Sequence, residues 1–269
     1  MAEQVITRVG DEAPQIGESP SGSLHVGVDL GTAFLVLVVL DENRLPIIGE
    51  YQFAQVARDG LVVDFVGAVD LLKGMKARVE ARLGRELTHA HSGYPPGVGQ
   101  SEVRATANVV EAAGFTCSGL TDEPTAANAV LGIRDGAIVD VGGGTTGVAV
   151  LQDGEVIYTA DEATGGTHFS LVIAGAHDIS FEDAEKMKLD LNEQKRLFPV
   201  IRPVMEKVGS IVARHIAEYP VEKITLVGGS TAFPGFADVV AEATGVQTEV
   251  PERPVFVTPL GMAMHDVAA

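Results

Sequence analysis

Apolar residues recur along this chain with two different spacings, and the two spacings alternate from residue 24 onward. Short apolar runs bounded by glycine, proline or charged residues predict strands, whereas apolar positions three or four residues apart predict helices. Strands are predicted within Leu24–Leu40, Pro46–Phe53, Leu87–Ser92, Ala137–Thr159 and Glu222–Val227. Helices are predicted at Phe65–Leu83, Ser101–Ala113, Asp122–Leu131, Ser180–Lys188, Leu197–Glu218, Phe233–Thr244 and Thr258–Val267. This alternation predicts an α/β protein with helices layered on mixed sheets.

Two glycine-rich turns follow predicted strands, one in each half of the chain. In both, an Asp lies near the end of an apolar run, and Gly and Thr separate it from the next strand. The residues are Asp29, Gly31 and Thr32 in the first turn, and Asp140, Gly142, Gly143, Gly144, Thr145 and Thr146 in the second. Glycine lets backbone N–H groups approach phosphate oxygens closely, and Thr adds a neutral hydrogen bond. Since an Asp beside phosphate requires a cation, the turns predict a duplicated fold that holds one Mg²⁺-bound nucleotide from both sides.

The sequence argues against two other common nucleotide-binding motifs. It contains no Gly-x-x-x-x-Gly-Lys-Ser/Thr, which excludes a P-loop NTPase. Gly142, Gly144 and Gly147 do form a Gly-x-Gly-x-x-Gly pattern. In dinucleotide-binding proteins that pattern opens a helix, whereas the apolar run Val148–Leu151 that follows here predicts a strand. The pattern is therefore interpreted as a phosphate-binding turn and not as a Rossmann motif.

Composition and charge restrict the classes of partner. Hydrophobic residues make up 46% of the chain and charged residues 21%, which is typical of a globular protein. The formal net charge of −18 disfavours binding to nucleic acid, which needs clustered Lys and Arg, and to anionic membranes. Cys117 is the only cysteine, so no intrachain disulfide can form, which fits a reducing compartment. No signal peptide or membrane-spanning run is predicted, and we expect a cytoplasmic protein.

The first 23 residues have a different character from the rest. They combine Gly, Pro, Ser and acidic residues with little periodicity, and this predicts a flexible N-terminal tail over residues 1–23. An alternative is that Gln4–Val9 forms a short amphipathic docking segment.

Five motifs of the actin, Hsp70 and sugar-kinase superfamily occur in the expected order. They are the first phosphate motif at Asp29–Thr32, the first connecting helix at Glu123–Ala127, the second phosphate motif at Asp140–Thr145, the adenosine motif at Val227–Thr231 with Pro234, and the second connecting helix at Pro259–Ala263. The chain therefore resembles this superfamily over Leu24–Val267. The resemblance implies an actin/Hsp70-like (ribonuclease H-like) fold, a duplicated two-lobe ATPase with a central nucleotide cleft. It also implies ATPase domain I at residues 24–134 plus 258–269, and domain II at 135–257.

Further segments are similar to the EutJ family of ethanolamine-utilisation proteins, a compact and chaperone-like branch of this superfamily. These segments are Arg58–Gly60, Asp64–Val69, Tyr94–Gly97, Asp161–Gly166 and Ile211–Ile216. The resemblance implies a protein that binds ATP or ADP with Mg²⁺ and acts near a bacterial microcompartment. It also implies a protein client in ethanolamine catabolism, such as ethanolamine ammonia-lyase or a shell-associated enzyme. We expect no peptide-binding domain after the ATPase core.

The resemblance also assigns nucleotide-binding residues, each of which has a structural alternative. Glu123 would orient Mg²⁺ or the attacking water and complete a catalytic set with Asp29 and Asp140, or it would only stabilise a helix N-terminus. Glu185 and Lys188 would contact the nucleoside, or they would form a solvated ion pair one helical turn apart. The other positions are small residues expected near ribose, adenine or phosphate, with ordinary turns as the alternative. They are Gly165, Gly166, Gly228, Gly229 and Ser230.

Two departures from the superfamily concern catalysis. We find no equivalent of the Hsp70 lysine near the γ-phosphate, and no carboxylate base of the kind that a sugar kinase needs. ATP binding is therefore better supported than ATP hydrolysis, which is expected to be slow if it occurs. The expected mechanism is nucleotide-dependent closure of two lobes. The alternatives are an actin-like filament or scaffold subunit and a small-molecule kinase.

Overall fold

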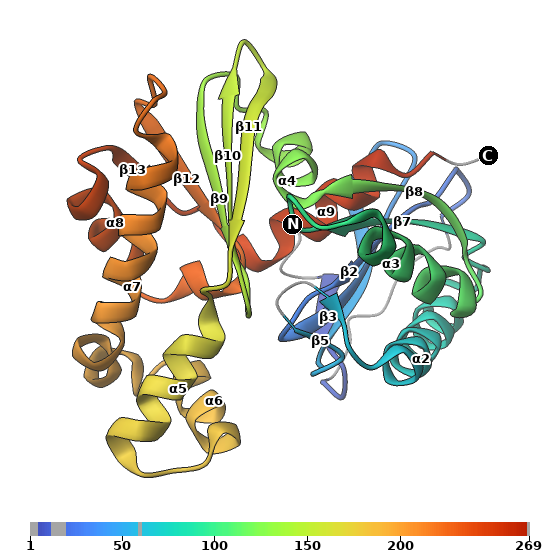
Figure 1. The fold of residues 1–269 in the computed structure, drawn as a ribbon. Helices are drawn as coiled ribbons and strands as arrows, with labels where there is room; N and C mark the ends of the chain where they lie inside the picture. Colours follow the sequence, from blue (N-terminus) through green and yellow to red (C-terminus); the bar gives the residue numbers. More distant parts are fainter. Residues whose placement is uncertain (1–4, 12–19, 59–60, 268–269) are drawn as a thin grey trace. The chain divides into compact units, whose positions relative to one another are not determined.

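The computed structural model describes residues 5–11, 20–58 and 61–267 (Figure 1). The chain divides into two compact units. Unit 1 comprises Met1–Gly132 and Phe256–Ala269, and unit 2 comprises Ile133–Val255. Each unit contains one large mixed sheet with helices packed on it, which confirms the α/β class predicted from the alternating spacings. None of the helices within the described ranges is long and apolar enough to cross a membrane.

The sheet of unit 1 has six strands in the order β1-β4-β3-β2-β7-β8. Strands β2, β3 and β4 are antiparallel neighbours, and β7 and β8 continue the sheet from β2 in parallel. Their bounds are β1 (Ile6–Arg8), β2 (His25–Leu30), β3 (Phe34–Leu40), β4 (Pro46–Phe53), β7 (His89–Tyr94) and β8 (Thr116–Asp122). A separate small antiparallel pair joins β5 (Ala57–Arg58) to β6 (Leu61–Val62).

Helices pack against both faces of this sheet. They are α2 (Phe65–Leu83), α3 (Gln100–Ala112), α4 (Glu123–Leu131) and α9 (Val257–His265). Successive side chains of a strand point to opposite faces of the sheet, so neighbouring residues of β2 face different helices. Val26 belongs to the same buried cluster as Leu72 of α2. Gly27 faces the other way, and a Cβ added to it would overlap the carbonyl oxygen of Pro259 in α9.

Unit 2 has a five-stranded sheet in the order β11-β10-β9-β12-β13. The strands are β9 (Gly136–Val141), β10 (Thr146–Gln152), β11 (Glu155–Glu162), β12 (Lys223–Val227) and β13 (Gln247–Glu249). The helices are α5 (Gly166–His177), α6 (Phe181–Leu189), α7 (Gln194–Ile216) and α8 (Phe236–Thr244), with the short 3-10 turn η1 (Gly229–Ala232). A second 3-10 turn, η2 (Pro254–Phe256), spans the boundary at which the chain returns to unit 1. Val139 and Val148 of the sheet share one buried cluster with Phe169 of α5 and Val212 of α7.

The two sheets repeat the same topology. Strands β4-β3-β2-β7-β8 of unit 1 and β11-β10-β9-β12-β13 of unit 2 agree in order and direction, with two antiparallel pairings followed by two parallel ones. The duplication predicted from the two Gly-rich turns is therefore confirmed. Strand β1 is the addition in unit 1 for which the described part of unit 2 has no counterpart.

Several elements were not predicted from the sequence, namely the strands β1, β5, β6, β8 and β13, the helix α5 and the 3-10 turns η1 and η2. Strand β8 has the sequence Thr-Cys-Ser-Gly-Leu-Thr-Asp, which is mostly small and polar and lacks the alternation of apolar and polar residues that predicts a strand. Strand β1 lies inside the predicted tail, so the prediction of a flexible tail is wrong for Ile6–Arg8. Residues 1–4 and 12–19 of that tail, and with them Gln4 of the alternative docking segment, lie outside the described residues.

Two helix starts differ from the predictions by three residues. Helix α7 begins at Gln194, so Pro199 and Pro203 lie inside it and not near its start. Helix α8 begins at Phe236 instead of Phe233, because Gly235 before it has a left-handed backbone with φ of 83°. Apolar spacing alone did not reveal either boundary.

Candidate nucleotide-binding site

The first Gly-rich turn joins β2 to β3 in unit 1. Asp29 is the next-to-last residue of β2, where it pairs with Val36, and residues 31–33 form the turn. Asp29, Gly31 and Thr32 are all partly exposed. A Cβ added to Gly31 would lie 2.7 Å from the carbonyl oxygen of Phe34, so the tight turn requires glycine.

Glu123 lies at the same edge of the unit 1 sheet as Asp29. It is the first residue of α4, directly after β8, and Asp122 caps this helix by accepting a 3.1 Å hydrogen bond from the backbone N–H of Thr125. Strands β2, β7 and β8 run parallel, so their carboxyl ends share one edge of the sheet. Asp29 and Glu123 therefore approach this edge about two strand spacings apart, roughly 10 Å.

The second Gly-rich turn joins β9 to β10 in unit 2. Asp140 is the next-to-last residue of β9, as Asp29 is of β2, and residues 142–145 form the turn. Asp140 is buried, with 8% of its surface exposed. It pairs with Val227 of β12, and a Cβ added to the next residue, Gly228, would overlap the Asp140 carboxylate. Gly228 also has a φ of 90°, so both space and backbone conformation require glycine there.

The glycine pair and the adenosine motif lie directly against this turn. The backbone N–H of Gly166 donates to the carbonyl oxygen of Gly142 at 2.9 Å, and the hydroxyl of Ser230 donates to the same oxygen at 2.7 Å. A Cβ added to Gly165 would lie 2.7 Å from that oxygen. One added to Gly166 would overlap the Ser230 hydroxyl. The carbonyl of Gly142 thus connects the turn, the start of α5 and the start of η1.

Thr146 helps to attach the glycine pair, Gly165 and Gly166, to the second Gly-rich turn. Its side chain is fully buried, and its hydroxyl donates to the carbonyl oxygen of Thr164 at 2.6 Å, just before the glycine pair. The backbone N–H of Thr167 donates to the carbonyl oxygen of Gly143 at 2.7 Å. The glycine pair is therefore attached to the second turn on both sides.

Glu185 and Lys188 form a buried ion pair on α6, and the solvated alternative is wrong. The Lys188 Nζ lies 2.6 Å from Oε1 of Glu185, and their side chains are 14% and 9% exposed. The same ammonium donates to the Gly166 carbonyl at 3.1 Å and to the Ser170 hydroxyl at 3.0 Å. Burial lowers the pKa of Lys188, and the charge of Glu185 and its hydrogen bond oppose that change. The Ser170 hydroxyl in turn donates to Glu185.

The sequence did not reveal Ser170 as a member of this group. It lies four residues after Gly166 on α5, a segment for which no helix was predicted although Phe169, Val172, Ile173 and Ala176 have helical spacing. With Ser170 included, unit 2 brings the second turn, the glycine pair, Ser230 and the ion pair together. Unit 1 brings Asp29, Gly31, Thr32 and Glu123 to one sheet edge.

A hollow of about 480 Å³ borders the adenosine motif in unit 2. It is lined by residues 231–238 and by Val250, Pro251, Arg253, Pro254 and Val255. Gly229 is exposed beside it, and a Cβ on Gly229 would lie 3.4 Å from Cγ2 of Val255. The predicted residue Gly229 therefore lies next to an apolar wall.

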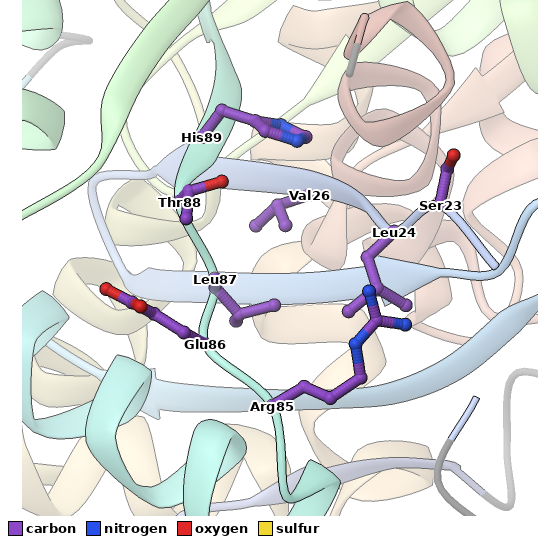
Figure 2. A pocket seen from close by; sticks show the side chains of 8 residues that line it. All are labelled: Ser23, Leu24, Val26, Arg85, Glu86, Leu87, Thr88 and His89. Carbon is purple, nitrogen blue, oxygen red and sulfur yellow. The ribbon is translucent and has the colours of Figure 1, made fainter. Parts of the chain in front are cut away.

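A second hollow, of about 180 Å³, lies in unit 1 away from the predicted residues (Figure 2). Figure 2 shows its lining side chains, which are Ser23, Leu24, Val26, Arg85, Glu86, Leu87, Thr88 and His89. The Arg85 guanidinium donates to the carbonyl oxygens of Pro20 and Gly22 at 2.6 and 2.7 Å. The guanidinium of Arg85 therefore anchors the backbone of Pro20 and Gly22, just before β2. This hollow does not belong to the predicted nucleotide site.

The donor set fits a magnesium ion that keeps most of its water. Within the described ranges, no group of three or more His, Cys, Asp or Glu side chains could hold a metal by itself. Mg²⁺ is usually bound through one or two carboxylates, water and substrate phosphates. Asp29 in unit 1 and Asp140 in unit 2 each lie beside a Gly-rich turn, so each unit offers one carboxylate of this kind.

Comparison with known proteins gives the family. The sequence profile of the family described as "Type IV pilus assembly protein PilM" matches residues 111–258. The chain is 40% identical over 261 residues to the ethanolamine utilization protein EutJ of Escherichia coli (strain K12), covering 97% of this chain and 91% of that protein. The chain belongs to the EutJ family, and the PilM profile matches more than half of its length.

Solved structures agree with this assignment. The crystal structure of EutJ from Carboxydothermus hydrogenoformans superposes with a TM-score of 0.88 at 44% identity, covering 93% of this chain and 92% of that chain. An MreB protein of Spiroplasma citri, crystallised with ADP, superposes with a TM-score of 0.72 at 18% identity, covering 91% and 96%. The second similarity shows the fold alone. Together they confirm the actin/Hsp70-like ATPase fold and the EutJ resemblance expected from the motifs.

Proposed function

We propose that this EutJ-family protein binds ATP or ADP with Mg²⁺ through its two Gly-rich turns. The observation that carries the proposal is the assembly in unit 2, where Gly166 and Ser230 both bind the Gly142 carbonyl and Lys188 lies against Gly166. An ordinary hairpin turn needs none of these neighbours. The repeated position of Asp29 and Asp140, each next to last in its strand, supports a matching contribution from unit 1.

Each residue has a role in this proposal that follows from its chemistry. Backbone N–H groups of the glycine turns bind phosphate oxygens. Asp29 and Asp140 hold Mg²⁺ through its water molecules, and Glu123 orients one such water. Bound Mg²⁺ supplies the positive charge that this acidic chain, with a net charge of −18, needs to accept a polyphosphate.

The nucleoside is assigned to the side of unit 2 that carries the adenosine motif. Gly229 allows the base to approach the backbone, and the hollow beside Val255 provides apolar surface for it. Glu185 can accept a hydrogen bond from a ribose hydroxyl. The ammonium of Lys188, which is paired with Glu185, holds the Gly166 carbonyl at 3.1 Å and so fixes the start of α5 beside the second turn.

We propose a chaperone-type role in ethanolamine utilisation, in which nucleotide closes the two units and its hydrolysis, if any, is slow. Membership of the EutJ family supports the metabolic context. A cytoplasmic protein client, either ethanolamine ammonia-lyase or an enzyme associated with a microcompartment shell, is the partner that this role requires. A ligand that favours the closed form must bind it more tightly than the open form.

The test is calorimetric titration of ATP–Mg²⁺ into the wild type and into Asp140→Asn, with phosphate release measured in parallel. Loss of a charge-assisted contact should weaken binding by about tenfold or more. Glu182→Gln, an exposed carboxylate on α6, is the matched control and should bind as the wild type does. A well-folded wild type that does not bind ATP or ADP would contradict the proposal.

A further inference from the structure

His168 lies in the first turn of α5 and has no role in the site described above. Its Nδ1 accepts a hydrogen bond from the backbone N–H of Gly165 at 3.3 Å, so the imidazole lies against the glycine pair. Gly165 in turn packs on the second Gly-rich turn, since an added Cβ would lie 2.7 Å from the carbonyl oxygen of Gly142 and 2.9 Å from that of Gly143. The imidazole is therefore held next to the second turn.

The hydrogen bond from Gly165 fixes which ring nitrogen of His168 carries the proton. A backbone N–H is a donor, so Nδ1 must offer its lone pair, and the proton of the neutral ring is then on Nε2. The side chain is half-buried, and within the described ranges Nε2 has no hydrogen-bond partner. His168 thus presents an N–H donor beside the second turn that the protein itself does not use.

The backbone donors at the start of α5 are already used within the protein. The first three N–H groups of the helix donate to the carbonyl oxygens of Gly142, Gly143 and Gly165 in turn. The ammonium of Lys188 is likewise taken up by its three partners on α5 and α6. The backbone at this helix end is therefore not an anion site, and a bound oxyanion must be reached from α5 by a side chain.

We propose that His168 is a phosphate-binding residue, whose Nε2–H donates to a phosphate oxygen of the nucleotide held at the second Gly-rich turn. His168 would extend the site of the proposed function, on which this assignment rests, by a side chain that none of the sequence motifs includes. The phosphate chain is the assigned partner because His168 binds Gly165, which faces the turn. The nucleoside side is marked instead by Gly166, where an added Cβ would overlap the hydroxyl of Ser230.

Two substitutions separate the two ring nitrogens of His168. His168→Asn places an amide oxygen near the position of Nδ1, so it can still accept the Gly165 N–H, but it has no donor near the position of Nε2. His168→Gln reaches further and restores that outer donor. In calorimetric titration of ATP–Mg²⁺ into the full chain, His168→Asn should bind about tenfold more weakly, and His168→Gln within about threefold of the wild type. His177→Asn, the same substitution at the last residue of α5, is the matched control and should bind as the wild type does.

Two further measurements distinguish a phosphate contact from other roles of the ring. In ¹⁵N NMR of the wild type, with His168→Asn to assign the signals, the proton of His168 should be on Nε2, and the Nε2 resonance should shift when ADP–Mg²⁺ is added. The loss of affinity in His168→Asn should be the same for ATP and for 2′,3′-dideoxy-ATP, which lacks both ribose hydroxyls, because the contact does not involve the ribose.

Four results would overturn the assignment while leaving the proposed function intact. In the first, His168→Asn is folded by circular dichroism and binds ATP–Mg²⁺ as tightly as the wild type. In the second, His168→Gln binds no more tightly than His168→Asn. In the third, the loss of affinity disappears with dideoxy-ATP, which would place the imidazole on the ribose. In the fourth, NMR finds the proton of His168 on Nδ1. A folded wild type that binds neither ATP nor ADP would instead contradict the proposed function, and this assignment with it.

Discussion

The ammonium of Lys188 and the carboxylate of Glu185 meet at 2.6 Å in a place where both side chains are nearly buried. A buried ion pair is weak support for stability, because losing water costs about as much as the attraction returns. Here the pair also reaches the carbonyl of Gly166 and the hydroxyl of Ser170. It therefore links α6 to the first turn of α5, directly behind the second Gly-rich turn.

Removing one partner of this pair should destabilise the protein strongly. Lys188→Met leaves the Glu185 carboxylate buried without its cation, and we expect a loss of about 3 kcal/mol in the free energy of unfolding. The double variant Glu185→Leu/Lys188→Met should recover most of that loss. Urea unfolding measures both.

The exposed pair Asp183–Lys186 on the same helix is the matched control. Its side chains are 58% and 77% exposed and lie 2.9 Å apart. Lys186→Met should change the free energy of unfolding by no more than about 0.5 kcal/mol. Equal effects of Lys188→Met and Lys186→Met would show that burial of the first pair has no energetic consequence.

Gly166 and Gly175 provide a second matched comparison, because both lie on α5. A Cβ at position 166 would overlap the hydroxyl of Ser230 beside the second turn, whereas nothing lies within 4 Å of a Cβ at position 175. Gly166→Ala should weaken ATP–Mg²⁺ binding by about tenfold or more. Gly175→Ala should leave binding unchanged and raise stability by about 0.5–1 kcal/mol, since alanine favours the helix.

Calorimetry and thermal unfolding test these two variants together. If Gly166→Ala bound nucleotide as the wild type does, the contact between the glycine pair and η1 would have no part in the site. If both variants lost binding, the effect would come from α5 in general and not from the approach to Ser230.

The sequence predicted the two turns well because their chemistry is local. Asp29 and Asp140 occupy equivalent strand positions, and a pattern of apolar run, Asp, Gly and Thr is sufficient to find them. The start of the helix predicted at Ser180–Lys188 is equally local, since Ser180 accepts a 3.1 Å hydrogen bond from the backbone N–H of Asp183. Such features depend on residues within a few positions of one another.

Features that depend on distant neighbours were missed. Strand β1 exists because Gly49 leaves a recess for Ile6, more than forty positions away. Helix α5 begins at Gly166, where the Gly142 carbonyl, more than twenty positions away, accepts its first N–H. Glu185 and Lys188 are likewise buried because α5 packs against α6. Their spacing of three residues within α6 gives no indication of that packing.

His91 gives unit 1 a specific response to acid. It is 6% exposed, and its Nε2 lies 2.7 Å from the hydroxyl oxygen of Thr121. Burial and the neighbouring His265 lower the pKa of His91 from 6.5 to about 4, although Asp266 opposes the change. The unfolded chain therefore binds this proton at a higher pH than the folded chain does.

Stability contributed by His91 should consequently fall as the pH drops from 6.5 towards 4, and level off below that range. The total difference is at most about 3 kcal/mol. His91→Gln removes the titrating group, so urea unfolding of the variant should depend less steeply on pH within this window. Parallel pH profiles of the two proteins would contradict the assigned shift.

Gly261 determines how closely α9 can approach α4. A Cβ at this position would overlap the carbonyl oxygen of Ala126, so the contact uses backbone against backbone. The chain leaves unit 1 after α4 and re-enters it just before α9, which makes this contact the place where both connecting segments are held in unit 1. Gly261→Ala must separate the helices or bend one of them, and we expect a loss of about 1–3 kcal/mol in the free energy of unfolding.

Gly74→Ala on α2 separates this packing effect from the general effect of alanine in a helix. A Cβ there would lie 3.2 Å from Nη1 of Arg78, the mobile end of a long side chain that can move away. Gly74→Ala should therefore be neutral or stabilising by up to about 1 kcal/mol. Since both substitutions add one methyl group to a helix of unit 1, a stability loss confined to Gly261→Ala can only come from the α4–α9 contact.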